Sequence, residues 1–280
     1  MTPQPSEMVE KTGLPAPTDD IVIASAGEKS EWRQGRYLSI VSLVLYFGAW
    51  FGLTHSGLVA DFKLPSPEAV VEAAITLRSV IVGDILATVA RVVAGLTLGV
   101  LFGVGLGLLM SYSKRAFYFF DPIVEMMRPV PVIAMIPFFL LWFGINEQGK
   151  LLLVLMGVFT IMVVSTVEAV RNVPRIYTRA ASTLGASRNQ TFRRVVLPAI
   201  VPSLIGPLRV AAALSFTLVV AAEFMGAQSG VGYRIMEARR LFNPDVIMLG
   251  IAIFGFLSFV LDTVVRKTTT YITRWSERTL

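Results

Sequence analysis

Long runs of apolar residues, separated by short polar connections, dominate the chain from residue 37 onward. A helix needs about 20 mostly apolar residues to cross a bilayer, because its backbone N–H and C=O groups must be paired inside the segment. The pattern predicts six such helices, at about residues 37–54, 85–111, 120–143, 150–170, 199–223 and 245–265. We therefore expect an all-α, polytopic membrane protein whose transmembrane permease domain spans residues 33–265.

The composition agrees with this pattern. Of the 280 residues, 54% are hydrophobic and 16% are charged, and the mean hydropathy of +0.67 is too high for a soluble domain of this size. The chain has no cysteine, which excludes disulfides, zinc–thiolate sites and a cysteine nucleophile. The single histidine, His55, has no acidic neighbour at metal-ligand or triad spacing. We expect no catalytic residue, metal or cofactor.

The two ends of the chain are polar. Residues 1–32 are rich in acidic residues and proline and lack the basic-then-apolar order of a secretory signal, so we expect a disordered cytoplasmic tail. Residues 266–280 combine basic side chains with Tyr271 and Trp275. This composition is typical of a cytoplasmic C-terminal segment lying at the membrane interface rather than of a nucleic-acid site.

Basic residues are concentrated on one side of the predicted membrane crossings. With the N-terminus in the cytoplasm, Arg33, Arg36, Lys114 and Arg115 lie inside, together with the basic connection 171–198 and the C-terminal segment. This distribution follows the positive-inside bias. We therefore expect a multi-pass protein of the cytoplasmic membrane with both termini in the cytoplasm.

The second predicted span carries a regular stripe of glycines. Gly95, Gly99, Gly103 and Gly107 recur every four residues and so share one face of the helix. Small residues at this spacing allow a neighbouring helix backbone to approach closely. We expect this face to be a packing seam inside the membrane rather than a nucleotide loop.

The connection 171–198 is too long and too patterned for a simple turn between two spans. Gly185 permits a sharp turn at its middle. Apolar residues lie on both sides of it, namely Ala180, Ala181, Leu184 and Ala186 before or at the turn, and Phe192, Val195 and Val196 after it. We expect two short helices, joined near Gly185, that present a knob to a groove of a partner protein.

This connection resembles the EAA loop of permease subunits in ATP-binding-cassette (ABC) importers. Ala180 and Ala181, Gly185, and Leu197 followed by Pro198 match the spacing of that loop throughout. Val195 takes the place of the usual isoleucine, and Arg179 stands where the family usually has glutamate. The glutamate-to-arginine difference changes any charge contact at this position and leaves the glycine and the Leu-Pro pair in place.

The resemblance extends over nearly all of residues 64–265. The segments that carry it are LPSPEAV at 64–70, ATVARVVAGL at 87–96, DPIVEMMRPVPVIAMIPFFLLWFGI at 121–145, EAVRNVP at 168–174 and AAEFMGAQSGVGYRI at 221–235. In this order they are similar to bacterial inner-membrane permeases for nitrate, taurine and aliphatic sulfonates. Relatives that share these motifs also carry pyrimidines or aromatic carboxylates.

The resemblance implies a fold, a set of partners and a docking site. It implies a type I ABC importer permease fold, pairing with a second permease copy in a homodimer or with a related non-identical one, an extracytoplasmic substrate-binding protein, and two ABC ATPase subunits. The residues implied in coupling to the ATPase are Arg179, Ala180, Ala181, Leu184, Gly185, Ala186, Leu197 and Pro198. The chain itself contains no G-x-x-x-x-G-K-[ST] loop, so we expect ATP hydrolysis on the partner rather than here.

Ionisable residues and prolines inside the predicted spans indicate a translocation pathway. A charge in the bilayer is costly unless it faces a cavity or a partner, and prolines that break a helix are tolerated only where protein or water surrounds them. We assign to the pathway Arg128, Pro129, Pro131, Met135, Arg209 and Glu223. For Arg128 an alternative is a purely structural pair with Glu125, three residues earlier, and for Met135 an alternative is plain core packing.

The connection 226–245 carries Arg234, Arg239 and Arg240 on the side that is otherwise poor in basic residues. Its glycines permit turns, and residues 233–241 have the composition of a short helix. One interpretation is an entrance loop that meets the binding protein and attracts anions. The other is a solvated face on which Glu237 neutralises one of the arginines.

Two functions from different classes are consistent with the residues alone. The first is the permease subunit of an ATP-driven, binding-protein-dependent importer of a small anion, working by alternating access. The second is a proton-coupled secondary transporter that uses Arg128, Glu125 or Glu223 as a relay, although the two halves of the chain show no clear internal repeat.

Overall fold

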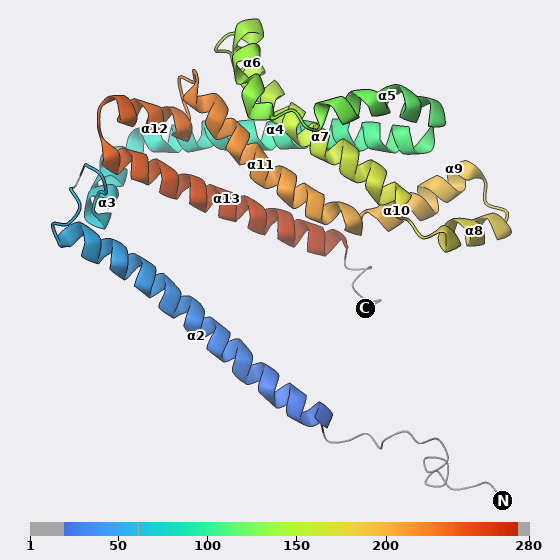
Figure 1. Cartoon of the computed structure of the whole chain (residues 1–280), viewed down its shortest axis with the longest axis horizontal. Coiled ribbons are helices and arrows are strands. Elements are labelled where there is room, and N and C mark those ends of the chain that lie inside the picture. Colours follow the sequence, from blue (N-terminus) through green and yellow to red (C-terminus); the bar gives the residue numbers. More distant parts are fainter. Residues whose placement is uncertain (1–19, 61, 274–280) are drawn as a thin grey trace, which may run out of the picture. The chain divides into compact units, whose positions relative to one another are not determined.

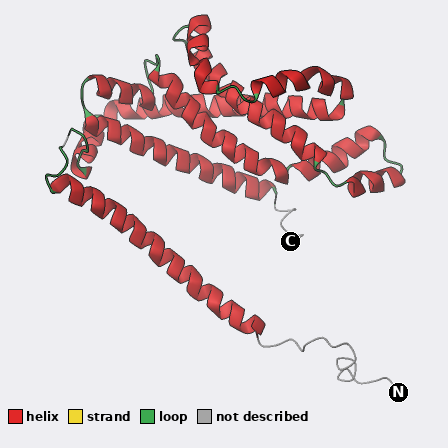
Figure 2. Cartoon of the chain, viewed as in Figure 1, coloured by secondary structure: helices red, strands yellow, loops and turns green. Residues whose placement is uncertain are grey.

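The computed structural model describes residues 20–60 and 62–273. Within these ranges the chain consists of helices and connecting loops, with no β-strand (Figure 2). This confirms the all-α prediction. The chain divides into two units, residues 1–67 and 68–280.

The described part of the first unit contains the long helix α2, Asp20–His55. Its segment Tyr37–His55 is long and apolar enough to cross a membrane, which confirms the first predicted span. The indole Nε1 of Trp50, on α2, donates to the carbonyl of Pro65 at 3.0 Å and so holds the loop that follows the helix against α2.

The start of α2 differs from the disordered tail expected over residues 1–32. Residues 20–32 are helical, because no proline follows Pro17 until Pro65 and nothing in this stretch breaks the backbone hydrogen-bond pattern of the helix. Residues 1–19 of the expected tail lie outside the described part of the chain.

From Pro67 onward, the described residues form α-helices and three short helical segments of other types. In chain order these are α3 (Pro67–Thr76), α4 (Arg78–Tyr112), α5 (Lys114–Met127), η1 (Val132–Met135), α6 (Ile136–Phe143), α7 (Glu147–Arg171), α8 (Arg175–Thr183), α9 (Arg188–Thr191), η2 (Phe192–Val196), α10 (Leu197–Ile200), η3 (Pro202–Leu204), α11 (Ile205–Phe224), α12 (Val231–Arg240) and α13 (Pro244–Ile272). Helix α7 packs against α4 and α11, and α13 packs against α11 and α12. Figure 1 shows α12 at one end of the second unit and α8 and α9 at the other.

Four helical segments of this unit are long and apolar enough to span a membrane: Arg78–Tyr112, Glu147–Arg171, Pro202–Phe224 and Pro244–Tyr271. The third predicted span is instead a pair of helices, Lys114–Met127 and Val132–Phe143, bent by 87°. The break contains Pro129 and Pro131, which cannot donate backbone hydrogen bonds. The described residues thus hold five candidate spans, or six if the bent pair counts as one.

The last span continues beyond its predicted end. Helix α13 runs to Ile272, so the first part of the expected interfacial segment 266–280 is a continuation of the helix. Thr269, on this continuation, and Thr273, directly after the helix, are buried. Residues 274–280 lie outside the described part.

The glycine stripe of α4 is the packing seam that the sequence predicts, and its partner is α7. A Cβ placed on Gly99 would lie 2.6 Å from the Cβ of Val158, and one on Gly103 would lie 2.7 Å from the Cβ of Met162 and 2.9 Å from the carbonyl oxygen of Phe159. All three distances are shorter than van der Waals contact. The absence of side chains therefore sets the separation of the two helices.

This seam predicts that Gly103→Ala destabilises the folded chain. The added methyl group overlaps a Cβ and a backbone oxygen, neither of which can move independently, and such overpacking typically costs about 1–3 kcal/mol. The measurement is the thermal unfolding midpoint of the purified protein in detergent. Gly105→Ala is the matched control, because a Cβ on Gly105 meets nothing within 4 Å. Equal midpoints for the two variants would contradict the seam.

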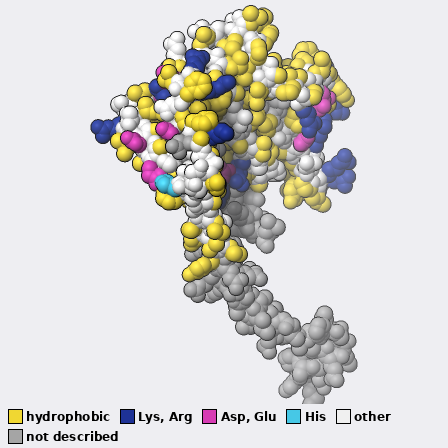
Figure 3. All heavy atoms as spheres, turned by 60° about the vertical axis from the view of Figure 1, so that its left-hand side comes forward, with side chains coloured by type: hydrophobic (Ala, Val, Ile, Leu, Met, Phe, Trp, Pro, Cys, Tyr) yellow, Lys and Arg dark blue, Asp and Glu magenta, His cyan; other side chains and the backbone are white. Residues whose placement is uncertain are grey.

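The surface of the described part agrees with a membrane environment. Hydrophobic side chains are spread widely over the described surface visible in Figure 3, and charged side chains gather in separate groups. The exposed apolar residues include Leu101 (63%), Leu141 (83%) and Trp142 (69%). Apolar exposure of this extent on membrane-length helices indicates contact with lipid or with other apolar helices.

Candidate functional site

The connection between α7 and α10 folds as two short helices around Gly185. The amide of Gly185 donates to the carbonyl of Ser182, and the amide of Ala186 donates to the carbonyl of Ala181, both at 3.0 Å. This pair of bonds is a Schellman turn, which requires a left-handed residue, and Gly185 has φ 76°. A serine–glutamine capping box then starts α9. The predicted helix pair is thus confirmed.

The turn carries an exposed apolar tip. Leu184 is 87% exposed, and Ile176 and Tyr177 on α8 are exposed as well. Of the residues that the resemblance assigns to coupling, Arg179, Ala180 and Gly185 are also exposed, Ala186 is partly buried and Ala181 is buried. An exposed leucine on a left-handed turn projects from the surface, as the predicted knob requires.

The remaining two coupling residues lie on α10, beyond the π-helical segment η2. Leu197 packs with the buried residues Val196, Ile200 and Ala169, so this part of the connection is anchored to the end of α7. Pro198 is exposed at the start of α10. The structure therefore divides the predicted coupling residues into an exposed turn and an anchoring segment.

The predicted pathway residues fall in three separate places. Arg128, Pro129 and Pro131 are exposed at the bend between α5 and α6. Arg128 lies 3.9 Å from carboxylate oxygens of both Glu125 and Glu168. Its predicted partner on α5 is therefore joined by a second one on α7.

Met135, at the end of η1, is partly buried beside a cluster formed by Ile136, Leu153 and Ala222. Core packing, the alternative drawn from the sequence, therefore accounts for part of its surface. The bend thus combines exposed prolines with a side chain that is wedged against α7 and α11.

Arg209 is paired across two membrane helices. Its Nε and Nη2 atoms donate to the carboxylate of Asp262 on α13 at 2.9 and 3.1 Å. The two side chains are 46% and 44% exposed. Because an exposed ion pair on membrane-spanning segments is unfavourable against lipid, this face requires a cavity or a protein partner.

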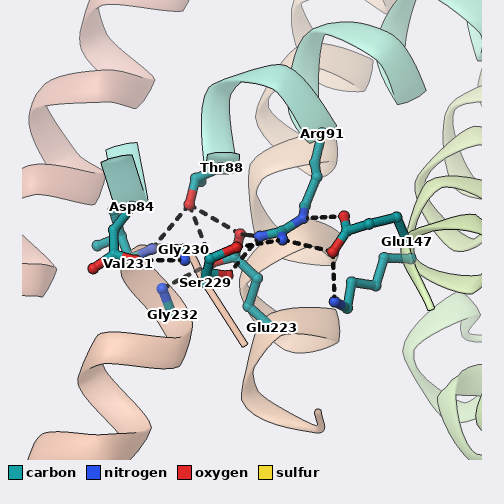
Figure 4. Close-up of polar contacts among 10 residues, drawn as sticks. Asp84, Thr88, Arg91, Glu147, Glu223, Ser229, Gly230, Val231 and Gly232 are labelled. Carbon is teal, nitrogen blue, oxygen red and sulfur yellow. Dashed lines mark hydrogen bonds and ion pairs between the residues drawn. The ribbon is translucent and has the colours of Figure 1, made fainter. Parts of the chain in front are cut away.

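Glu223 belongs to a buried ion-pair network centred on Arg91 (Figure 4). The guanidinium donates to Glu223 at 2.5 Å, to both oxygens of Glu147 at 2.6 and 2.8 Å, and to the carbonyl of Ser229 at 2.8 Å. The side chain of Arg91 is 7% exposed and that of Glu223 is 0% exposed. Lys150 also binds Glu147, at 2.9 Å. One arginine thus ties together α4, α7, α11 and the loop before α12.

The same network caps the first turn of α12 (Figure 4). The first amide groups of a helix have no partner within it, and here each donates to a side chain of the network. The pairs are Gly230 with Asp84 Oδ1 (2.9 Å), Val231 with Thr88 Oγ1 (2.9 Å) and Gly232 with Glu223 Oε2 (2.8 Å). Two of the three acceptors are carboxylates, and their negative charge also interacts favourably with the positive end of the helix dipole.

The three arginines of α12 are not equivalent. Arg234 is 16% exposed and pairs with Asp84 at 2.8 Å and with Glu237. Burial alone would lower the pKa of Arg234, but the hydrogen bonds and charges of these two carboxylates raise it above its usual value. Arg239 and Arg240 are exposed. The predicted neutralisation by Glu237 applies to Arg234, and the predicted short helix is confirmed as α12.

Sequence reasoning missed most of this network. It identified Glu223 as a charge within a span, but not Asp84, Thr88, Arg91 or Glu147 as members of the same network. One available signal is that Asp84, Thr88 and Arg91 extend the glycine stripe of α4 toward its N-terminus at spacings of three and four residues. The partners on α7 and α11 carry no such signal.

Metal binding has no support in the described ranges 20–60 and 62–273. They contain no group of three or more histidine, cysteine, aspartate or glutamate side chains placed to hold a metal ion.

Comparison with known proteins adds to this geometry. Residues 95–276 match the family described as "Binding-protein-dependent transport system inner membrane component". The chain is 31% identical over 256 residues to the taurine transport system permease protein TauC of Escherichia coli K12, covering 88% of this chain and 93% of TauC. It is 31% identical over 268 residues to the putative aliphatic sulfonates transport permease protein SsuC of Bacillus subtilis 168, covering 94% of this chain and 95% of SsuC.

Among solved structures, the chain is similar to an inward-facing MetNI methionine ABC transporter. The TM-score is 0.56 at 20% identity, covering 69% of this chain and 97% of that one. A likeness at this level of identity concerns the fold alone, and it agrees with the arrangement of helices described above.

Proposed function

From the premise that the chain belongs to the family of inner-membrane components of binding-protein-dependent transport systems, and is the permease subunit of an ABC importer, we propose that it provides the path for a small sulfonate or a related small anion. The relatives named for taurine and for aliphatic sulfonates support this substrate class. The chain changes no bond in the substrate, and the energy comes from ATP hydrolysed by two partner subunits. A second copy of the chain completes the path.

The exposed turn at Leu184 is the observation that carries this proposal. Its 87% exposure beside a left-handed Gly185 makes it a rigid apolar projection that suits a groove of the ATPase subunit. Because α8 to α10 carry many basic residues, we place this end of the unit in the cytoplasm, with both termini. Closure of the ATPase dimer then draws the two copies of the turn together and changes the state of the path.

We assign the bend between α5 and α6 to the wall of the path. The 87° break exposes Arg128, Pro129 and Pro131, and irregular backbone at membrane depth needs protein or water around it. Met135, at the same bend, is assigned to the wall as well. Arg209 is also assigned to the wall, because its exposed pair with Asp262 requires surroundings other than lipid. For Glu223, burial beneath Arg91 favours a role in holding the wall rather than direct contact with the substrate.

The substrate class is tested on the partner binding protein and the assembled complex. Taurine, short alkanesulfonates, nitrate, a pyrimidine and an aromatic carboxylate are compared as ligands that shift its thermal unfolding. Each is then tested as a stimulant of ATP hydrolysis by the complex in proteoliposomes. We expect a sulfonate to act in both assays. If only the pyrimidine or only the aromatic carboxylate stimulates ATP hydrolysis, the assignment of the substrate to the sulfonates and related small anions is overturned.

We assign Arg239 and Arg240, exposed on α12, to the entrance for anions, with Arg234 as the paired residue that fixes the helix. Arg239→Gln with Arg240→Gln should lower the initial rate of radiolabelled sulfonate uptake roughly 3- to 10-fold at low ionic strength, with a smaller effect at high salt. Lys63→Gln with Arg78→Gln, which removes the same charge from other exposed positions, is the control. Unchanged uptake in the α12 variant would remove the assignment.

A further inference from the structure

A cavity of about 280 Å³ lies at the end of the unit that carries α8 and α9. It is bounded by the end of α4, the start of α5, the end of α7 and the first residue of α9. Lys114, Arg171 and Arg188 supply its cationic side chains, and no carboxylate is among its lining residues. Within the described residues none of these three cations takes part in an ion pair.

Two of the three cations are held in place by aromatic rings. The guanidinium carbon of Arg171 lies 4.7 Å from the ring centroid of Phe117, and that of Arg188 lies 4.9 Å from the ring centroid of Tyr112. Arg188 also donates a hydrogen bond to the backbone carbonyl of Tyr112. A guanidinium stacked on a ring keeps most of its N–H donors free and in a fixed plane, which suits a phosphate group. The positive charge is therefore positioned before a ligand binds.

Apart from Ser111, the rest of the cavity wall is formed by aliphatic and aromatic side chains. Met110 of α4 and Val167 and Val170 of α7 line it, and both helices continue from the cavity as membrane spans. Tyr118, 74% exposed, stands at its edge like the aromatic residues that mark membrane interfaces. A ligand for this cavity thus needs a negative head and a hydrocarbon part.

We propose that this cavity binds the headgroup phosphate of an anionic phospholipid. Basic pockets between transmembrane helices at the cytoplasmic surface recognise such headgroups. Arg171 and Arg188 contact the phosphate, Lys114 adds charge, and the glycerol and the first part of the acyl chains lie along α4 and α7. The bound lipid bridges the end of α7 and the loop of α8 and α9. Its assignment to the cytoplasmic leaflet rests on the proposed orientation, whereas the binding itself does not.

The test compares lipids bound to the full chain, alone and in its complex with the ATPase, by native mass spectrometry. Phosphatidylglycerol, phosphatidylcholine and inorganic phosphate are the probes. Arg171→Gln with Arg188→Gln should weaken phosphatidylglycerol binding roughly 10- to 30-fold. Lys114→Gln removes an exposed cavity charge that neither an aromatic ring nor a hydrogen bond holds in the described part of the chain, so it should give a smaller loss of lipid binding. It replaces the double variant in this test if the double variant does not fold. Arg193→Gln with Arg194→Gln, exposed cations that do not line the cavity, is the charge-matched control.

Selective retention of phosphatidylglycerol by the wild type and by the control, but not by the cavity variant, supports the proposal. An equal loss in both double variants would mean that only overall charge matters and would overturn it. Displacement by inorganic phosphate at equal concentration would instead identify a free-anion site. Complete loss of the lipid on assembly with the ATPase would assign the cations to the protein partner. None of these readings depends on transport.

Discussion

Leu184→Asp is expected to abolish most ATP-driven uptake while leaving the chain folded. The side chain is almost fully exposed, so the substitution costs the isolated permease little. In the complex, an aspartate would enter an apolar groove without a partner, which costs roughly 2 kcal/mol or more and weakens association about 30-fold. Co-purification of the ATPase with the tagged permease measures this directly, and uptake into proteoliposomes measures its consequence.

The control for this experiment is Leu58→Asp, the same change at a leucine that is 81% exposed outside α8 to α10. It should bind the ATPase as the wild type does. If Leu184→Asp also retains full association and uptake, the turn at Gly185 does not carry the coupling.

Arg91→Met is expected to cause the largest loss of stability of any single substitution considered. It leaves the carboxylate of Glu223 buried and without the one cationic partner that it has among the described residues, and breaking a buried pair in this way typically costs about 3–5 kcal/mol. Arg91→Met combined with Glu223→Gln should recover much of the loss, because the uncompensated charge is then gone. The midpoint of thermal unfolding in detergent, read from the loss of monodisperse protein on heating, measures both variants.

Two comparisons sharpen this prediction. Glu223→Gln alone should be milder than Arg91→Met, since Arg91 keeps Glu147 as a second carboxylate partner. Arg128→Met, which removes an arginine 55% exposed with partners 3.9 Å away, should change the midpoint little, because exposed pairs contribute about 0–1 kcal/mol. A midpoint for Arg91→Met equal to that of Arg128→Met would show that the network does not stabilise the fold.

Local features of the sequence predicted much of the fold. Apolar runs of membrane length placed α2, α4, α7, α11 and α13, since each helix satisfies its own backbone and needs no knowledge of its neighbours. The glycine stripe predicted a close helix contact because a four-residue spacing defines a face without reference to the partner. Gly185 predicted a sharp turn because a left-handed φ is a local property.

Features that depend on distant residues were not predictable. The prolines indicated a break in the third span, but its 87° angle depends on packing against α7 and α11. The contacts of Arg91 with Glu147 and Glu223 join residues 56 and 132 positions apart, and nothing in the local sequence specifies such pairs. The cavity beside Arg171 and Arg188 likewise appears only when four helices meet.

The central claim, that the turn at Gly185 couples this permease to a cytoplasmic ATPase, has a direct test in a chain without cysteine. Leu184→Cys is prepared as the only thiol and treated with a membrane-impermeant thiol reagent from each side of sealed vesicles. The complex with the ATPase is then treated with a short thiol cross-linker. We predict labelling only from the cytoplasmic side, protection by the bound ATPase and a cross-link to that subunit. Labelling from the outside, or the absence of both protection and cross-link in a complex that transports, would contradict it.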